Sequence, residues 1–170
     1  MTHSAFLTLK EPSRCSPGEI DGFCRIVLGE GQVSRERFEK RVRKARLLAF
    51  LTDSDGGDVI AAAAVKRPDP GYQKEVFGKA DVSGFENKTA LELGWVVVSP
   101  AHQRNGHCGR LVEAVLQDLE SEDLYATSKV DNLPMHKVLG RFGFLKVGRS
   151  YVSKNRSGEI ALFVRLSSRP

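Results

Sequence analysis

The stretch from Leu91 to Arg110 constrains the fold of this chain more than any other. Its apolar run Trp95 to Val98 is β-branched and aromatic, and Pro100 stops that run because proline cannot donate to a sheet ladder. A glycine-containing loop follows, and then apolar residues recur on one face of a helix that we expect to start near Gly109. These residues are Leu111, Val112, Val115, Leu116 and Leu119. The stretch predicts a buried strand, a loop and an amphipathic helix.

The loop precedes the predicted helix, where amide hydrogens lack intrahelical partners and the helix dipole is positive. Gly106 and Gly109 would let a ligand approach the backbone closely. Such a turn is an anion site, most naturally for phosphate. Loops of this composition also occur as plain strand-to-helix connections, so the loop alone leaves both interpretations open.

The spacing within the loop resembles that of a known family. Gln103, Gly106 and Cys108 resemble the acetyl-CoA loop of the GNAT superfamily of N-acetyltransferases, whose pattern is Gln or Arg, two residues, Gly, one residue, then Gly or Ala. Cys108 departs from the pattern, but cysteine is small enough to keep close backbone approach. The segment from Asn132 to Phe144 is similar to the family's Asn, short helix and terminal Gly-Phe.

The rest of the chain predicts a series of short elements. Ser16, followed by proline and by Glu19, is a capping-box signature for a first helix, and Ser34 would cap a second. The predicted strands are 5–9, 47–51, 59–65, 91–98, 123–130, 146–153 and 160–166, and the last helix begins at Pro134. The long connection 66–89, with a helical turn near 72–80, is expected to border the substrate site.

The resemblance covers nearly the whole chain, although its specific motifs lie between residues 91 and 144. It implies a mixed α/β GNAT fold in the order β-α-α-β-β-β-α-β-α-β-β, with a central mixed sheet flanked by helices. We expect a single N-acetyltransferase domain over residues 1–170, a length that suits one domain.

Composition narrows the class of protein. Hydrophobic residues at 41% and charged residues at 28% describe a soluble globular protein. No apolar run approaches the length of a membrane span and the N-terminus lacks a signal-peptide pattern, so we expect no membrane association and a cytoplasmic protein. The three cysteines form no C-x-x-C pair and the four histidines are scattered, so we predict no metal.

The most basic stretch of the chain is the second predicted helix, residues 35–46. We interpret it as a solvated face, because no aromatic residues interleave with its charges as a base-stacking surface would need. A patch for an anionic partner such as tRNA or DNA is the alternative, and the net charge of +5 is compatible with both. Nucleic acid is therefore a partner that we do not favour.

Glu92 is the candidate general base. It lies in the strand ahead of the loop, between Leu91 and Leu93, where partial burial would make it a better base. The resemblance places it where many members of the family carry that carboxylate. The alternative is a structural acid paired with a lysine or arginine.

The resemblance also implies a site for acetyl-CoA. The backbone of Val96 and Val98 would bond the thioester carbonyl and the pantetheine arm, and Asn132 would contact the pantetheine. The loop would hold the pyrophosphate by its amides, with Arg104 and Arg110 adding charge. The residues assigned to the cofactor are Val96, Val97, Val98, Gln103, Arg104, Asn105, Gly106, His107, Cys108, Gly109, Arg110 and Asn132.

The acid that protonates the departing thiolate is the component without a clear candidate. Leu139 stands where many family members carry a tyrosine, and a leucine cannot donate a proton. His136, one turn earlier, is the candidate substitute, and a merely solvated histidine is the alternative.

We therefore predict an acetyl-CoA-dependent N-acetyltransferase that acts by direct transfer on a primary amine of a small molecule or a peptide. The scaffold serves many acceptors, so neither the acceptor nor a homodimer can be derived from the sequence. The alternatives are a CoA-binding or nucleic-acid- or protein-binding module with little turnover, and an acetyltransferase that acts on aminoacyl-tRNA.

Overall fold

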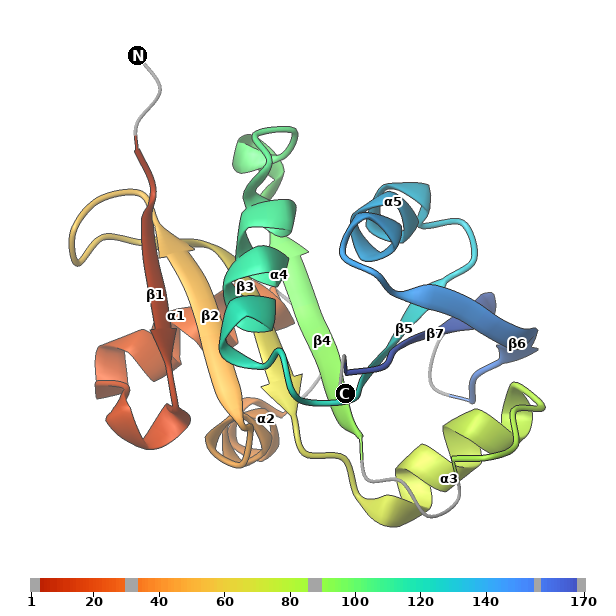
Figure 1. Ribbon diagram of the computed structural model, residues 1–170. Helices are drawn as coiled ribbons and strands as arrows, with labels where there is room; N and C mark the ends of the chain where they lie inside the picture. The colour runs from red at the N-terminus through yellow and green to blue at the C-terminus, as the bar shows by residue number, and fades with distance from the viewer. Residues whose placement is uncertain (1–3, 30–33, 86–89, 155–156, 168–170) are drawn as a thin grey trace. The chain divides into compact units, whose positions relative to one another are not determined.

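The computed structural model of the chain describes residues 4–29, 34–85, 90–154 and 157–167 (Figure 1). In these ranges the strands are β1 (Phe6–Lys10), β2 (Leu47–Thr52), β3 (Val59–Lys66), β4 (Leu91–Val98), β5 (Leu124–Lys129), β6 (Leu145–Val152) and β7 (Glu159–Arg165). The helices are α1 (Pro17–Leu28), α2 (Arg35–Arg43), α3 (Pro70–Lys79), α4 (His107–Asp118) and α5 (Leu133–Arg141), with short 3-10 turns η1 (Pro12–Arg14) and η2 (Pro100–His102). None of these helices is long and apolar enough to cross a membrane.

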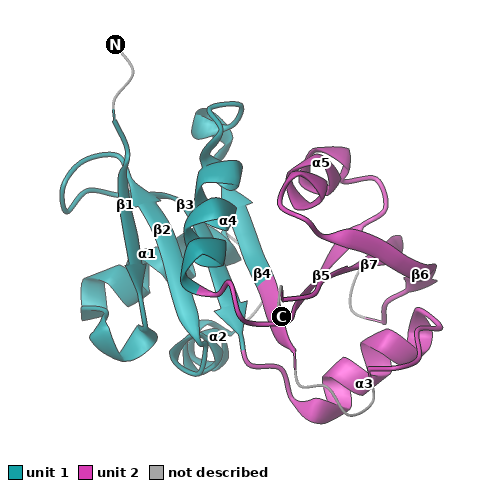
Figure 2. Cartoon of the chain, in the orientation of Figure 1, with its two compact units in different colours: residues 1–66, 94–118 teal, residues 67–93, 119–170 magenta. Residues whose placement is uncertain are grey.

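The strands form one mixed sheet of seven described strands in the order β1-β2-β3-β4-β5-β7-β6, which confirms the predicted fold class. The chain divides into two compact units (Figure 2). Unit 1 comprises Met1–Lys66 and Gly94–Asp118, and unit 2 comprises Arg67–Leu93 and Leu119–Pro170. The division falls inside β4, so that one strand contributes residues to both units.

Unit 1 covers both faces of its strands with helices. The hairpin of β2 and β3 pairs antiparallel, and β1 extends it with Phe6 opposite Thr52. Helices α1 and α2 lie on one face, where they pack against Leu48 and Phe50, and α4 lies on the other (Figure 1). Because both faces are covered, every residue of β2 is buried and the strand shows an almost continuous apolar sequence.

Helix α1 starts where the capping signature predicts. The Ser16 hydroxyl accepts from the Glu19 amide at 3.1 Å, and the Glu19 carboxylate accepts from the Ser16 amide at 2.8 Å. Helix α2 begins directly after Ser34, also as predicted, yet the Ser34 side chain makes no capping hydrogen bond to a described residue. The first helix therefore has a complete capping box and the second does not.

Unit 2 places one helix on each face of its strands. In α3, Phe77 meets Tyr125 edge-on, with ring centroids 5.3 Å apart. In α5, the His136 ring lies 4.8 Å from Phe163, and Leu139 is fully buried. Tyr125 and Phe163 point to opposite faces, since Phe163 pairs in register with Ala126.

The predicted elements agree with the structure except at their limits and at one helix, because the predicted order has no helix between β3 and β4, where the structure has α3. Helix α4 starts at His107 rather than near Gly109, because the Gly106 carbonyl already accepts from the Arg110 amide at 3.0 Å. The helical turn expected near 72–80 is a full helix, α3, whose first residue is Pro70. The predicted end of the 66–89 connection lies outside the described residues.

The two serines allow a matched test of capping. Replacing Ser16 with alanine should lower the free energy of unfolding by about 1 kcal/mol, because the Glu19 amide loses its acceptor. Ser34→Ala should stay within about 0.5 kcal/mol of wild type, because its side chain caps nothing described. Urea unfolding followed by circular dichroism measures both, and equal losses in the two variants would contradict this assignment of the caps.

Candidate functional site

The strand that leads to the site contains an unusual backbone conformation. Trp95, in the middle of β4, has a φ of +50°, in the left-handed region that bulky residues rarely adopt. Its ring packs edge-on against Phe38, with centroids 5.0 Å apart, and against Phe23 at 6.4 Å. The guanidinium of Arg41 and the ammonium of Lys66 lie 5.5 and 5.2 Å from its centroid. Packing in unit 1 therefore holds the residue in place against its backbone preference.

A glycine just before the tryptophan allows this arrangement. A Cβ atom at Gly94 would lie 2.6 Å from Cε of Lys66, closer than real carbon atoms approach. The parallel register between β4 and β5 covers Leu91 to Leu93 and ends before Gly94. A glycine inside a strand often marks a bulge, so Gly94 was the sequence signal that could have revealed this feature.

The loop between β4 and α4 is closed by its own side chains. The Ser99 amide donates to the Ile60 carbonyl at 2.9 Å, and Nε2 of Gln103 donates to the Val98 carbonyl at 3.4 Å. Nδ2 of Asn105 donates to the His102 carbonyl at 3.1 Å. Gln103 and Asn105, which the sequence assigns to ligand binding, thus also set the shape of the loop.

The backbone of the loop presents hydrogen-bond donors at the start of α4. Arg104 and Gly106 have φ values of +65° and +74°, and a Cβ atom at Gly106 would meet nothing within 4 Å. The amides of residues 104–107 donate to no backbone carbonyl in the described chain. They lie at the positive end of a twelve-residue helix, where an anion is stabilised. This part of unit 1 can bind a phosphate group.

The first turn of α4 contains the remaining predicted loop residues. His107 is half-buried, and burial, followed by the charges of His102 and Arg110, lowers the pKa of its imidazole, so that the ring is neutral at pH 7. Cys108 is half-buried and unoxidised, and Gly109 is buried against the unit. Arg110 donates from Nη1 to the Ala5 carbonyl at 2.8 Å, which ties α4 to the residue before β1.

In unit 2, the candidate base lies in the first half of β4. Glu92 is only 3% exposed and pairs in register with Tyr125 of β5, so both side chains share the face that α3 covers. The Tyr125 hydroxyl is buried. Burial, with the charge of Glu92 as the next contribution, raises the pKa of Tyr125, so the phenol stays protonated. The sequence analysis missed Tyr125 because Leu124 to Ala126 resembles an ordinary core strand.

The other two predicted residues of unit 2 lie on α5. Oδ1 of Asn132 accepts from the Met135 amide at 3.3 Å and caps the helix. Nε2 of His136 lies 2.9 Å from the Lys129 carbonyl, and since a carbonyl only accepts, that nitrogen carries the proton. Leu139 is fully buried, one turn further along. Both Asn132 and His136 thus have structural contacts.

The basic helix α2 has most of its charge compensated. Lys40 pairs with Glu36 at 2.8 Å and Arg43 pairs with Glu39 at 2.6 Å. Arg41 stacks on the Trp95 ring, and Arg35 pairs with Asp21 of α1. These contacts support a solvated structural face rather than a surface reserved for nucleic acid.

Comparison with known proteins identifies the family. The sequence matches the family model described as "Acetyltransferase (GNAT) family" over residues 19–144. No curated protein matches the sequence significantly.

Solved structures share the fold. An acyl-CoA N-acyltransferase from Pseudomonas aeruginosa superposes with a TM-score of 0.65 at 17% identity, over 95% of this chain and 99% of that one. ElaA from Escherichia coli gives 0.68 at 11% identity, over 95% and 99%. The ribosomal-protein-S18-alanine N-acetyltransferase from Escherichia coli gives 0.65 at 16% identity, over 97% of each chain. Identities this low establish a common fold, and the family match spans most of the chain. The chain therefore belongs to the acetyltransferase (GNAT) family and is an N-acetyltransferase by class.

Proposed function

We propose that the protein transfers the acetyl group of acetyl-CoA directly to a primary amine, with Glu92 as the general base. The amine nitrogen attacks the thioester carbon, and the base takes the proton that the nitrogen loses. The carbon–sulfur bond then breaks, and CoA leaves as a thiolate that is protonated afterwards. Members of the family typically use acetyl-CoA, and the donor set of this chain suits its pyrophosphate.

The observation that carries the proposal is the run of amides at the start of α4. The amides of residues 104–107 have no backbone acceptor in the described chain, and the space above Gly106 is open. A diphosphate needs several converging donors and close access to the backbone, and this loop supplies both. Arg104 is exposed beside these amides and can add positive charge.

The environment of Glu92 supports its role as the base. The carboxyl group is almost completely excluded from solvent and is held by a strand whose pairing with β5 sets its position. A base on a rigid strand loses little entropy when it meets its substrate.

The leaving thiolate has no side-chain acid in this proposal. Leu139 carries no proton to donate, and the Nε2 proton of His136 is already shared with the Lys129 carbonyl. We infer that His136 positions α5, while the thiolate leaves directly or is protonated through water. A screen of amines by thermal shift in the presence of acetyl-CoA would identify the acceptor, because a ligand of the native state raises apparent stability.

Gly106 tests the cofactor site. In Gly106→Glu the added carboxylate would lie against the bound diphosphate, and two like charges about 4 Å apart repel by about 4 kcal/mol at an effective dielectric constant of 20. We expect CoA affinity, measured by calorimetry, to fall by at least about 100-fold.

Gly158 supplies the matched control for this change. It has a φ of +85° and equally open space at its Cβ position, so Gly158→Glu adds the same charge and a similar backbone strain elsewhere. Its CoA affinity should equal that of wild type. A folded Gly106→Glu protein with unchanged affinity would remove the loop from the cofactor site.

Glu92 tests the mechanism. Glu92→Gln keeps the shape of the side chain but cannot accept a proton, so kcat/KM should fall by roughly 10²–10⁴-fold. The loss should shrink at high pH, where more of the amine is already neutral. Glu113→Gln on the exposed face of α4 is the control and should leave the rate unchanged. If Glu92→Gln turns over at the wild-type rate, Glu92 is not the base, and the proton leaves the amine through water instead.

A substitution at His136 tests whether a side chain protonates the leaving thiolate. His136→Ala should leave kcat/KM close to wild type and lower the free energy of unfolding by about 1 kcal/mol, because one hydrogen bond to Lys129 is lost. Steady-state kinetics over a range of pH, together with urea unfolding, separates the two roles. A large rate defect in His136→Ala, together with loss of the alkaline limb of the wild-type pH profile, would make His136 the acid.

A further inference from the structure

A tyrosine and the candidate base are enclosed together in unit 2. The parallel register between β4 and β5 places Tyr125 opposite Glu92. Side chains that are opposite in register leave the sheet on the same face, and neighbouring strands lie about 4.8 Å apart. Tyr125 is fully buried and Glu92 is 3% exposed. A phenol and a carboxyl group therefore share one interior space from which water is excluded.

The surroundings of the phenol ring are apolar. Helix α3 contributes Val76 and Phe77, and β7 contributes Leu162 and Val164, to one buried cluster with Tyr125. The rings of Phe77 and Tyr125 meet edge-on, with centroids 5.3 Å apart. These contacts are made by the ring and not by its hydroxyl, so packing alone fixes the direction in which the hydroxyl points.

The Tyr125 hydroxyl needs an acceptor inside this cluster. The oxygen atom is buried, and a buried polar group costs free energy unless it is hydrogen-bonded. Burial raises the pKa of Tyr125, and the Glu92 carboxylate raises it further, both as a neighbouring charge and as an acceptor of the phenol proton. An ionised carboxylate can only accept. At pH 7 the phenol is therefore the donor of this pair.

The other titratable groups around Tyr125 contribute less. They are Tyr72 of α3 and Tyr151 of β6, and tyrosines carry no charge at pH 7. Tyr72 is 41% exposed. Tyr151 packs against the same cluster, but β5 and β7 separate its strand from β4. Tyr125 is thus the tyrosine whose strand neighbours that of Glu92.

We propose that Tyr125 is a positioning residue for Glu92, whose carboxylate it holds by donating a hydrogen bond from its hydroxyl. This inference rests on the proposed function, because Tyr125 acts on the reaction only through the base. A carboxylate offers several acceptor positions, so Glu92 can accept from the phenol and still take a proton. The proton of the amine passes to Glu92, and Tyr125 keeps its own.

Such a hydrogen bond would affect the base in two ways. It restricts the carboxylate to one orientation, so that less freedom is lost when the amine arrives. It also favours the charged form of the carboxylate, so that the base stays deprotonated to lower pH than it would without the bond. The second effect can be measured without any substrate.

A carbon-13 NMR titration of the side-chain carboxyl groups of the full chain, without CoA or an acceptor, tests the hydrogen bond. The Glu92 signal is identified by its absence in Glu92→Gln. Tyr125→Phe removes the hydroxyl and keeps the ring contact with Phe77. We expect this change to move the midpoint of the Glu92 titration to higher pH, because the charged carboxylate loses a donor.

Tyr151→Phe is the matched control for the titration. It makes the same change beside the same apolar cluster, on a strand that does not neighbour β4. The Glu92 midpoint of this variant should equal that of wild type. Equal midpoints in Tyr125→Phe and wild type would overturn the proposal, and so would an equal shift in the two tyrosine variants.

Hydrolysis of acetyl-CoA supplies the kinetic measurement, since water takes the place of the amine and no acceptor has to be known. Tyr125→Phe should lower kcat by about tenfold and keep the KM for acetyl-CoA within about twofold of wild type, because only the base is misplaced. In the Glu92→Gln background the same change should have no further effect. Additive losses would overturn the positioning role.

Failure of this inference can be told apart from failure of the proposed function. If Glu92→Gln hydrolyses acetyl-CoA at the wild-type rate, Glu92 is not the base, and a shifted midpoint then assigns the hydrogen bond to the fold alone. If Glu92→Gln is slow and the midpoints are equal, the base stands and Tyr125 has no part in it. The amide loop, residues 99–106 before α4, is tested separately by Gly106→Glu.

Discussion

The left-handed conformation of Trp95 is the backbone constraint that the packing of unit 1 has to maintain. An aromatic residue in this region costs of order 1–3 kcal/mol, and it persists only where the surroundings compensate. The compensation comes from two phenylalanine rings and two cations of unit 1, which surround the indole. Gly94 makes room for the lysine that contributes to this cage. Upstream of this point β4 pairs with β5, and downstream it runs to the amide loop.

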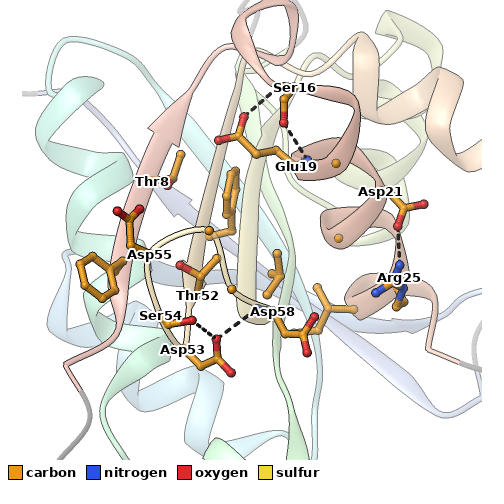
Figure 3. Close-up of a pocket in the computed structure, with 18 residues that line it drawn as sticks. Thr8, Ser16, Glu19, Asp21, Arg25, Thr52, Asp53, Ser54, Asp55 and Asp58 are labelled. Atoms are coloured by element: carbon orange, nitrogen blue, oxygen red, sulfur yellow. Dashed lines mark hydrogen bonds and ion pairs between the residues drawn. The ribbon is translucent and has the colours of Figure 1, made fainter.

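The two faces of the sheet in unit 1 present opposite polarity. On the α4 side, amides at the helix start and an exposed arginine favour an anion. On the α1 side, the β2–β3 connection contributes the carboxylates of Asp53, Asp55 and Asp58 to the lining of a hollow (Figure 3). A net positive charge over the whole chain gives no indication of this separation.

Local sequence signals predicted most of the elements, since each element is specified by contacts near in the chain. The capping box of α1, the proline that ends β4 and the apolar stripe of α4 all act within a few residues. The same locality explains the errors at element limits. The start of α4 depends on a single hydrogen bond from the Arg110 amide to the Gly106 carbonyl. The spacing of apolar residues does not reveal this bond.

The sequence by itself determined the order of the elements other than α3, the family and the loop before α4, because these depend on residue type and spacing. The tertiary structure decided which side chains meet across the chain. The register between β4 and β5 places Glu92 opposite Tyr125. Folding also brings the Lys129 carbonyl to His136 and the Ala5 carbonyl to Arg110. The hollow lined by Asp53, Asp55 and Asp58 depends in the same way on β1, α1 and the β2–β3 connection coming together. Such contacts join residues far apart in the chain, and local patterns carry no information about them.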